Sequence, residues 1–291
     1  MTRFPVTENS RDRKDSGMLR DITLGQYYQA DSPIHRMDAR VKLIGTLVYI
    51  ITLFLYKNLT IYLIALLFLG AMVKISKVPL SFILRGIKTI MILLIITAVF
   101  NMFLSPGKPI VSFWKFSLTW EGIANAFYLC IRLVFLIVGS SLMTLTTTPN
   151  QLTDGLESLL GPLKKIKVPV HEISMMMSIA LRFIPILLEE TDKIMKAQMA
   201  RGAEFDSGNL IKKVKALVPL LVPLFISAFR RANDLAMAME ARCYQGGEGR
   251  TKMKPLKYHK LDFGGFVVLA VYLTAAAVLG KLFPFHLIPL G

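Results

Sequence analysis

The stretch that decides the fold class is Ile123–Leu145, which reads IANAFYLCIRLVFLIVGSSLMTL and carries a single charged side chain. About 20 apolar residues suffice to cross a bilayer as a helix. Four further apolar stretches predict additional spans, at 41–56, 59–73, 83–104 and 263–279. The composition agrees, with 54% hydrophobic residues and a mean hydropathy of +0.52. The sequence therefore predicts an all-α integral membrane protein with about five transmembrane helices.

Charge and cysteine content exclude several other classes of protein. The 291 residues include 35 Lys and Arg against 19 Asp and Glu, a formal net charge of +16. A chain this apolar is not intrinsically disordered. Two distant cysteines, Cys130 and Cys243, form neither a disulfide scaffold nor a cysteine zinc site. A membrane protein with basic cytoplasmic parts and a membrane-bound nucleic-acid binder remain.

The distribution of positive charge predicts the orientation of the chain. With the N-terminus in the cytoplasm, the segments 1–42, 74–88 and 149–262 place eight, four and eighteen Lys and Arg inside. Cytoplasmic loops are enriched in these residues. Five spans then put the C-terminus outside. The basic run Lys252–Lys260 adjoins the last span, so we expect it to anchor that span and contact anionic lipid, and we expect no nucleic-acid partner.

Two more apolar stretches, 170–188 and 216–229, contain charges or prolines, and spans there would export a cluster of basic residues. We interpret both as interfacial or protein-packed helices of a large helical cytoplasmic segment. Four regions are predicted: a disordered cytoplasmic tail at 1–22, a four-helix membrane region at 23–148, a helical cytoplasmic region at 149–262, and a last span with an outward C-terminus at 263–291.

Within the cytoplasmic segment, one long helix is predicted to end at Ala200-Arg201-Gly202. Gly is favoured just past a helix end, and Arg in the last turn complements the helix dipole. At a shift of 41 residues, 192–202 (DKIMKAQMARG) aligns with 233–243 (NDLAMAMEARC), so a second helix ends in Ala241-Arg242. The guanidinium of Arg suits a carboxylate partner. We call these two helix ends, Ala200-Arg201 and Ala241-Arg242, the tips. Two similar tips indicate bivalent binding to a partner with two-fold symmetry. The alternative interpretation is that they are two unrelated, solvated helix ends.

Several motifs occur together in a characteristic order: 31–42 (DSPIHRMDARVK), 140–149 (SSLMTLTTTP), 181–185 (LRFIP), 200–202 (ARG) and 229–234 (FRRAND). With these motifs the chain, from about residue 22 onward, resembles the transmembrane T component of energy-coupling factor (ECF) transporters, a family related to the transmembrane subunit of cobalt transporters.

This resemblance implies a scaffold subunit of an ATP-driven importer of vitamins or other micronutrients. Its partners would be two ABC-type ATPases, identical or different, a membrane-embedded substrate-binding S component and the lipid bilayer of a prokaryotic cell membrane. In the family, coupling helices ending in Ala-Arg-Gly dock into grooves on the ATPases. Carried onto this chain, the ATPase-docking residues are Ala200, Arg201, Gly202, Ala241, Arg242 and Cys243. Cys243 occupies the position where the family usually has Gly, so the sequence leaves open whether the second helix ends in the same tight turn as the first.

We expect no enzymatic activity, because the chain has no G-x-x-x-x-G-K-[ST] loop to bind phosphates. The chain itself would need no cofactor, since ATP and Mg²⁺ would be bound by the ATPases. The scattered histidines predict no metal site. Arg132, within a span, is either a functional intramembrane charge or a structural one. The rival function is a self-sufficient secondary transporter or channel, which would require more ionisable groups within the spans.

Overall fold

The computed structural model of the chain describes residues 27–56, 58–104, 109–113, 116–203, 210–247, 253 and 255–282. The predicted tail at 1–22 lies outside these residues. The described chain divides into two compact units. The bundle unit holds residues 27–161 and 255–282, and the paired-helix unit holds residues 162–253.

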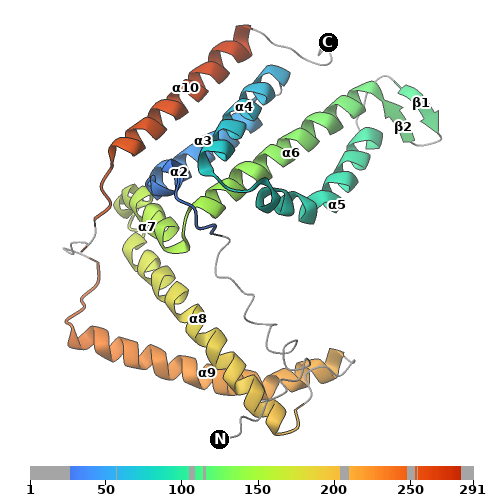
Figure 1. Ribbon diagram of the computed structural model, residues 1–291. Helices are drawn as coiled ribbons and strands as arrows, with labels where there is room; N and C mark the ends of the chain where they lie inside the picture. Colours follow the sequence, from blue (N-terminus) through green and yellow to red (C-terminus); the bar gives the residue numbers. More distant parts are fainter. Residues whose placement is uncertain are drawn as a thin grey trace, which may run out of the picture. The chain divides into compact units, whose positions relative to one another are not determined.

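Five helices of the bundle unit coincide with the five predicted spans, each ending within a few residues of the expected position. They are α3 (Ala39–Leu55), α4 (Leu59–Ser76), α5 (Leu80–Leu104), α6 (Trp120–Thr146) and α10 (Lys260–Leu282). Helices α3, α4, α6 and α10 pack against one another, and α5 packs along α6 (Figure 1). The predicted all-α membrane fold is therefore confirmed.

The core of the bundle unit lies where α3, α4 and α10 meet α6. Three rings form its centre: Tyr49 on α3, Phe68 on α4 and Tyr272 on α10, with the Phe68 and Tyr272 centroids 4.5 Å apart. Gly139 on α6 lies directly beneath Tyr49, and an added Cβ would come within 2.7 Å of that ring. This glycine therefore lets α6 approach α3 closely.

One feature was not expected from the sequence: a short antiparallel hairpin between α5 and α6. Its strands are β1 (Pro109–Phe113) and β2 (Phe116–Thr119), with an irregularity in register between Pro109 and Val111. The hairpin leads directly into α6, whose N-cap Thr119 accepts a hydrogen bond from the Gly122 N–H. The antiparallel pairing of these strands reverses the direction of the chain between α5 and α6.

The sequence motifs at 31–42 and 140–149 contain the residues that cap the N-termini of three helices. Ser32 is the N-cap of α2 (Pro33–Arg36), and Asp38 is the N-cap of α3. Thr148 and Gln151 form a capping box at the start of α7 (Pro149–Leu159), which packs against α3. Each cap satisfies N–H groups that have no partner inside the helix.

His35 of the first motif is buried and held at both ring nitrogens. Nε2 lies 3.0 Å from the Tyr28 carbonyl, which can only accept, so Nε2 carries the proton. Nδ1 then accepts from the Ser32 hydroxyl at 2.7 Å. Burial lowers the pKa of His35 below its ordinary value, which favours this neutral form.

Asp262 joins the starts of α3 and α10. It is 1% exposed, and its carboxylate accepts the N–H of Asp38 at 2.7 Å and the N–H of His259 at 2.6 Å. Arg40 reinforces this junction by donating to the Leu256 carbonyl and lying over the Tyr258 ring. The junction therefore fixes the level at which α3 and α10 begin.

Among the described residues, four helices are long and apolar enough to cross a membrane, or five if the two halves of α5, which are bent by 54°, count as one span. The four are α4, α6, α10 and α8 (Val170–Ala200) of the paired-helix unit. Helix α3, with 17 residues, is shorter than each of these helices. The segment 170–188, interpreted above as interfacial or protein-packed, is thus apolar enough to span.

We predict that Asp262→Asn destabilises the bundle unit by about 1–3 kcal/mol, because the amide accepts one of the two buried N–H groups and leaves the other without a partner. The matched control is Asp31→Asn, which removes a charge from an exposed ion pair with Arg36. Thermal unfolding of the full chain in detergent should show a lower midpoint for the first variant only. Equal midpoints for both variants would contradict the role given to Asp262.

Candidate functional site

The candidate site is carried by two long helices, α8 and α9 (Leu210–Ala241), which run in opposite directions and cross each other obliquely (Figure 1). Near the middle of α8, Glu190 accepts a hydrogen bond from the Ser227 hydroxyl and one from Arg231 at 2.7 Å, both on α9. This two-armed contact fixes the register of the pair. A carboxylate bound by both a hydroxyl and a guanidinium forms strong, directional hydrogen bonds.

A second contact compensates for a proline in α9. Pro223 has no N–H, so the Pro219 carbonyl one turn earlier has no helical donor. The Gln198 side chain of α8 donates to this carbonyl at 3.4 Å. The proline therefore gives α8 an anchoring point near its C-terminus.

Between Glu190 and the start of α8, the pair is apolar. Phe183 and Leu187 of α8 face Ala228, Ala232 and Leu235 of α9 around a small cavity. Alanine lets the helix backbones approach, so the pair stays close over several turns.

The first predicted tip is a Schellman ending. Helix α8 ends at Ala200, and Arg201 is its C-cap. The Gly202 N–H binds the Met199 carbonyl and the Ala203 N–H binds the Gln198 carbonyl, both at 3.0 Å. Gly202 has φ +87°, the left-handed conformation that this motif requires.

The second tip repeats this geometry 41 residues later. The Cys243 N–H binds the Glu240 carbonyl at 2.8 Å, and the Tyr244 N–H binds the Met239 carbonyl at 3.0 Å. Cys243 has φ +54°, so it adopts the left-handed conformation although it is not glycine. The tight ending questioned on sequence grounds is therefore present, and the 41-residue repeat extends to individual hydrogen bonds.

Both arginines stand at the C-cap and are exposed. Among the described residues, no ion pair involves Arg201 or Arg242. Because the helices are antiparallel, the tips lie at opposite ends of the pair.

The paired-helix unit buries little of its own apolar surface. Among its described residues, Val170 and Leu220 are the buried hydrophobic ones. Many large apolar side chains are exposed, including Phe225 at 64% and Phe229 at 63% on α9. Such a surface needs a bilayer or protein to cover it.

Arg132, the predicted intramembrane charge, belongs to the bundle unit. Its Nε donates to the Tyr62 hydroxyl at 3.2 Å, and its guanidinium lies 5.4 Å from the Phe54 ring centroid. These contacts to α4 and α3 favour a structural role. The described residues contain no group of three His, Cys, Asp or Glu placed to hold a metal ion.

We predict opposite effects for reciprocal substitutions at the two tips. A non-Gly residue in the left-handed conformation is disfavoured by about 1–2 kcal/mol. Cys243→Gly should therefore stabilise the end of α9, and Gly202→Ala should destabilise the end of α8 by a similar amount. Amide hydrogen exchange in the last turns should slow several-fold in the first variant and accelerate several-fold in the second. Identical exchange in both variants would contradict the observed conformations.

Known proteins match the chain over most of its length. The model of the family described as "Cobalt transport protein" matches residues 30–253. The "Energy-coupling factor transporter transmembrane protein EcfT" of Clostridium kluyveri is 56% identical over 248 residues, covering 84% of this chain and 92% of the relative. The protein of the same name from Bacillus subtilis is 48% identical over 255 residues, covering 87% and 96%.

A third relative of that name, from Lactococcus lactis, is 45% identical over 262 residues, covering 90% of this chain and 98% of its own. The matched region contains both helix tips and most of the bundle unit. These proteins and the apolar helices place the chain in a prokaryotic cell membrane. The chain belongs to the EcfT/CbiQ family, the transmembrane T components of energy-coupling factor transporters.

Proposed function

We propose that this chain is the energy-coupling scaffold of an ATP-driven importer and that Arg201 and Arg242 are its docking points for two ABC-type ATPases. The observation that carries the proposal is the pair of matched Schellman tips. Each tip presents an exposed guanidinium beyond the end of a helix. A carboxylate in a groove of the partner is the acceptor that suits this planar donor.

The arrangement of the tips suits a dimeric partner. Two copies of one binding surface are related by a two-fold axis and offer two equivalent grooves. Two similar tips at opposite ends of one helix pair can occupy both grooves at once. Two ATPases, identical or different, would each receive one tip.

The contacts between α8 and α9 support transmission of movement. Glu190 links α8 to both Ser227 and Arg231, and Gln198 binds the backbone of α9. A displacement at one tip is therefore resisted by directional contacts along the pair. When the ATPases close, the pair would move as a unit and pass the movement to a membrane-embedded S component.

The exposed apolar surface of the paired-helix unit supports a second partner. Phe225 and Phe229 lie one turn apart on α9 with ring centroids separated by 5.9 Å. Together with neighbouring aliphatic residues they offer contact area to the apolar surface of an S component. The S component would bind the transported vitamin or other micronutrient.

Energy would come from the partners. The sequence has no phosphate-binding loop, so ATP and Mg²⁺ would be bound by the ATPases and this chain would catalyse no reaction. The chain's part would be to hold the subunits together and to couple ATP hydrolysis to reorientation of the S component.

We infer that the N-terminus and both tips face the cytoplasm and that the C-terminus faces outward. The bundle is consistent with this topology, because α3 and α10 begin at one level through Asp262, and the end of α10 meets the start of α4 where Asn58 donates to the Gly280 carbonyl. The eighteen Lys and Arg at 149–262 favour the cytoplasm for α8 and α9.

We predict that Arg201→Glu and Arg242→Glu each weaken ATPase binding or abolish coupled uptake, and that the double variant is the most impaired. Removing one member of a buried ion pair costs about 2–5 kcal/mol, and reversing it adds repulsion between like charges. Co-purification of the ATPases and uptake in reconstituted vesicles measure the effect.

Lys165→Glu is the matched control, because it reverses a positive charge at an exposed position of the paired-helix unit that belongs to neither tip. This variant should assemble and transport normally. A double tip variant that retains its ATPases and imports at the wild-type rate would show that the tips are solvated helix ends.

The topology is tested at the two ends of α10. In a chain with Cys130 and Cys243 replaced by Ala, a cysteine introduced by Leu282→Cys should react with a membrane-impermeant maleimide in intact cells. A cysteine introduced by Lys260→Cys should react only after permeabilisation. Both positions are exposed in the structure, so accessibility of the side chain does not limit the reaction. The reverse pattern would overturn the orientation.

A further inference from the structure

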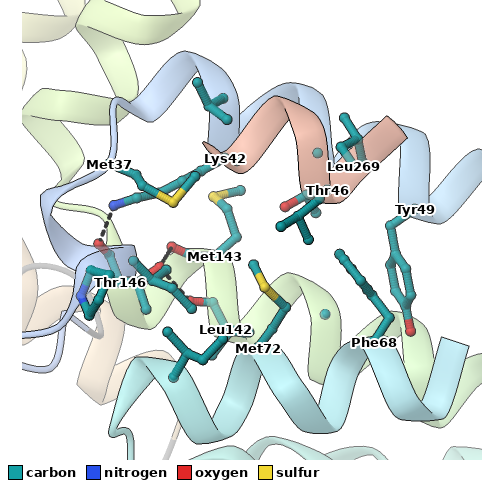
Figure 2. Close-up of a pocket in the computed structure, with 18 of the residues that line it drawn as sticks. Met37, Lys42, Thr46, Tyr49, Phe68, Met72, Leu142, Met143, Thr146 and Leu269 are labelled. Carbon is teal, nitrogen blue, oxygen red and sulfur yellow. Dashed lines mark hydrogen bonds between the residues drawn. The ribbon is translucent and has the colours of Figure 1, made fainter. Parts of the chain in front are cut away.

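The bundle unit contains an apolar cavity of about 310 Å³ that the proposed docking function does not use. It lies between α3, α4, α6 and α10, and Figure 2 shows side chains from all four helices around it. Met72, Met143 and Leu142 line its middle, and Tyr49 and Phe68 close one end. Methionine side chains adapt their shape, which suits a site for a flexible apolar ligand.

Missing side chains create the space. A Cβ added at Gly45 on α3 or at Gly264 on α10 would meet no atom within 4 Å, although both residues line the cavity. A cavity of about 150 Å³ holds a benzene molecule, so this cavity has room for roughly twelve carbon atoms. A well-packed protein interior contains few voids of such size.

The cavity opens sideways between two membrane helices. Its inner wall is buried, with Leu69, Leu142 and Leu269 each less than 9% exposed. By contrast Ile75 on α4 and Val268 on α10 are 46% and 48% exposed, and both line the cavity. Helices α4 and α10 meet at the other end of the pair, where Gly280 contacts Ile61. The opening therefore faces the lipid between the C-terminal half of α4 and the N-terminal half of α10.

Lys42, the one charged residue among the described residues that line the cavity, already has hydrogen-bond partners. Its ammonium donates to the Thr146 carbonyl at 2.8 Å and to the His35 carbonyl at 3.4 Å (Figure 2). The charge thus complements the C-terminal end of α6. The interior consequently suits a hydrocarbon chain better than a polar molecule.

Positive charge gathers at the mouth instead. Exposed Lys74 and Lys77 flank Ile75, and exposed Arg36 precedes Met37, which also lines the cavity. Asp31 pairs with Arg36 at 2.7 Å and also interacts electrostatically with Lys77, but the three basic side chains outnumber this one carboxylate, so the rim has a net positive charge. Basic residues beside a membrane helix attract anionic headgroups of the cytoplasmic leaflet.

We propose that the bundle unit binds one anionic phospholipid of the cytoplasmic leaflet as a structural ligand. One acyl chain enters between α4 and α10 and lies along the cavity towards Tyr49 and Phe68. The phosphate headgroup rests at Lys74 and Lys77. The site is separate from the helix tips and does not depend on their function.

The experiment is native mass spectrometry of the full chain, released from detergent containing phosphatidylglycerol or phosphatidylcholine with the same acyl chains. We expect one tightly held phosphatidylglycerol per chain and at least tenfold weaker retention of phosphatidylcholine. Gly45→Leu places a side chain in the cavity and should reduce retention of phosphatidylglycerol at least tenfold. Gly70→Leu is the matched control, because Gly70 is exposed on α4, does not line the cavity and also has no atom near an added Cβ.

Two further variants keep the test decisive. Gly264→Leu places a side chain at the mouth of the cavity and should also reduce retention of phosphatidylglycerol at least tenfold. This variant tests the proposal even if Gly45→Leu fails to fold. The double variant Lys74→Gln with Lys77→Gln should remove the preference for phosphatidylglycerol while leaving the weaker retention of phosphatidylcholine unchanged. Equal retention of the two lipids by the wild-type chain, or undiminished retention of phosphatidylglycerol by Gly264→Leu, would overturn the proposal.

Discussion

The arrangement of the membrane helices depends on the carboxylate of Asp262. This buried group accepts N–H groups from Asp38 and His259, so it completes the start of α10 and binds the start of α3 with one side chain. A buried carboxylate is tolerated where several donors replace its hydration. With the two starts held at one level, α3 and α10 run in the same direction, and α4 and α6 complete the bundle around the Tyr49, Phe68 and Tyr272 rings.

The two units differ in how they gain stability. The bundle unit has a core of aromatic and aliphatic residues contributed by several helices, with polar caps at the helix starts. The paired-helix unit has almost no buried apolar residue among those described and relies on Glu190, Gln198 and a short apolar contact. We expect such a pair to depend on lipid or protein that covers its outer surface. That dependence is appropriate for an element that would be assembled between other subunits and would move with them.

Glycine residues affect packing in two different ways in this chain, and at one helix end another residue adopts a backbone conformation that glycine favours. At Gly139 the missing side chain brings α6 against Tyr49, whereas at Gly45 and Gly264 it leaves space open. At the second tip, Cys243 adopts the backbone conformation that glycine favours, and the helix still ends with the same hydrogen bonds as the first. Tertiary or partner contacts can impose a left-handed residue that local preference disfavours.

The sequence by itself determined the five apolar helices of the bundle unit, the two long helices that end in Ala-Arg and the family, because apolar length and short motifs can be read directly along the chain. It did not reveal the hairpin before α6, whose pairing depends on where the flanking helices place the chain. Nor could it show that Glu190 meets Ser227 and Arg231, that Asp262 binds the start of α3, or that four helices enclose a cavity. The hydrogen bonds join residues that are 37 to 224 positions apart in the sequence. The cavity forms beside glycines, which have no side chain to fill it. Only packing in three dimensions decides these features.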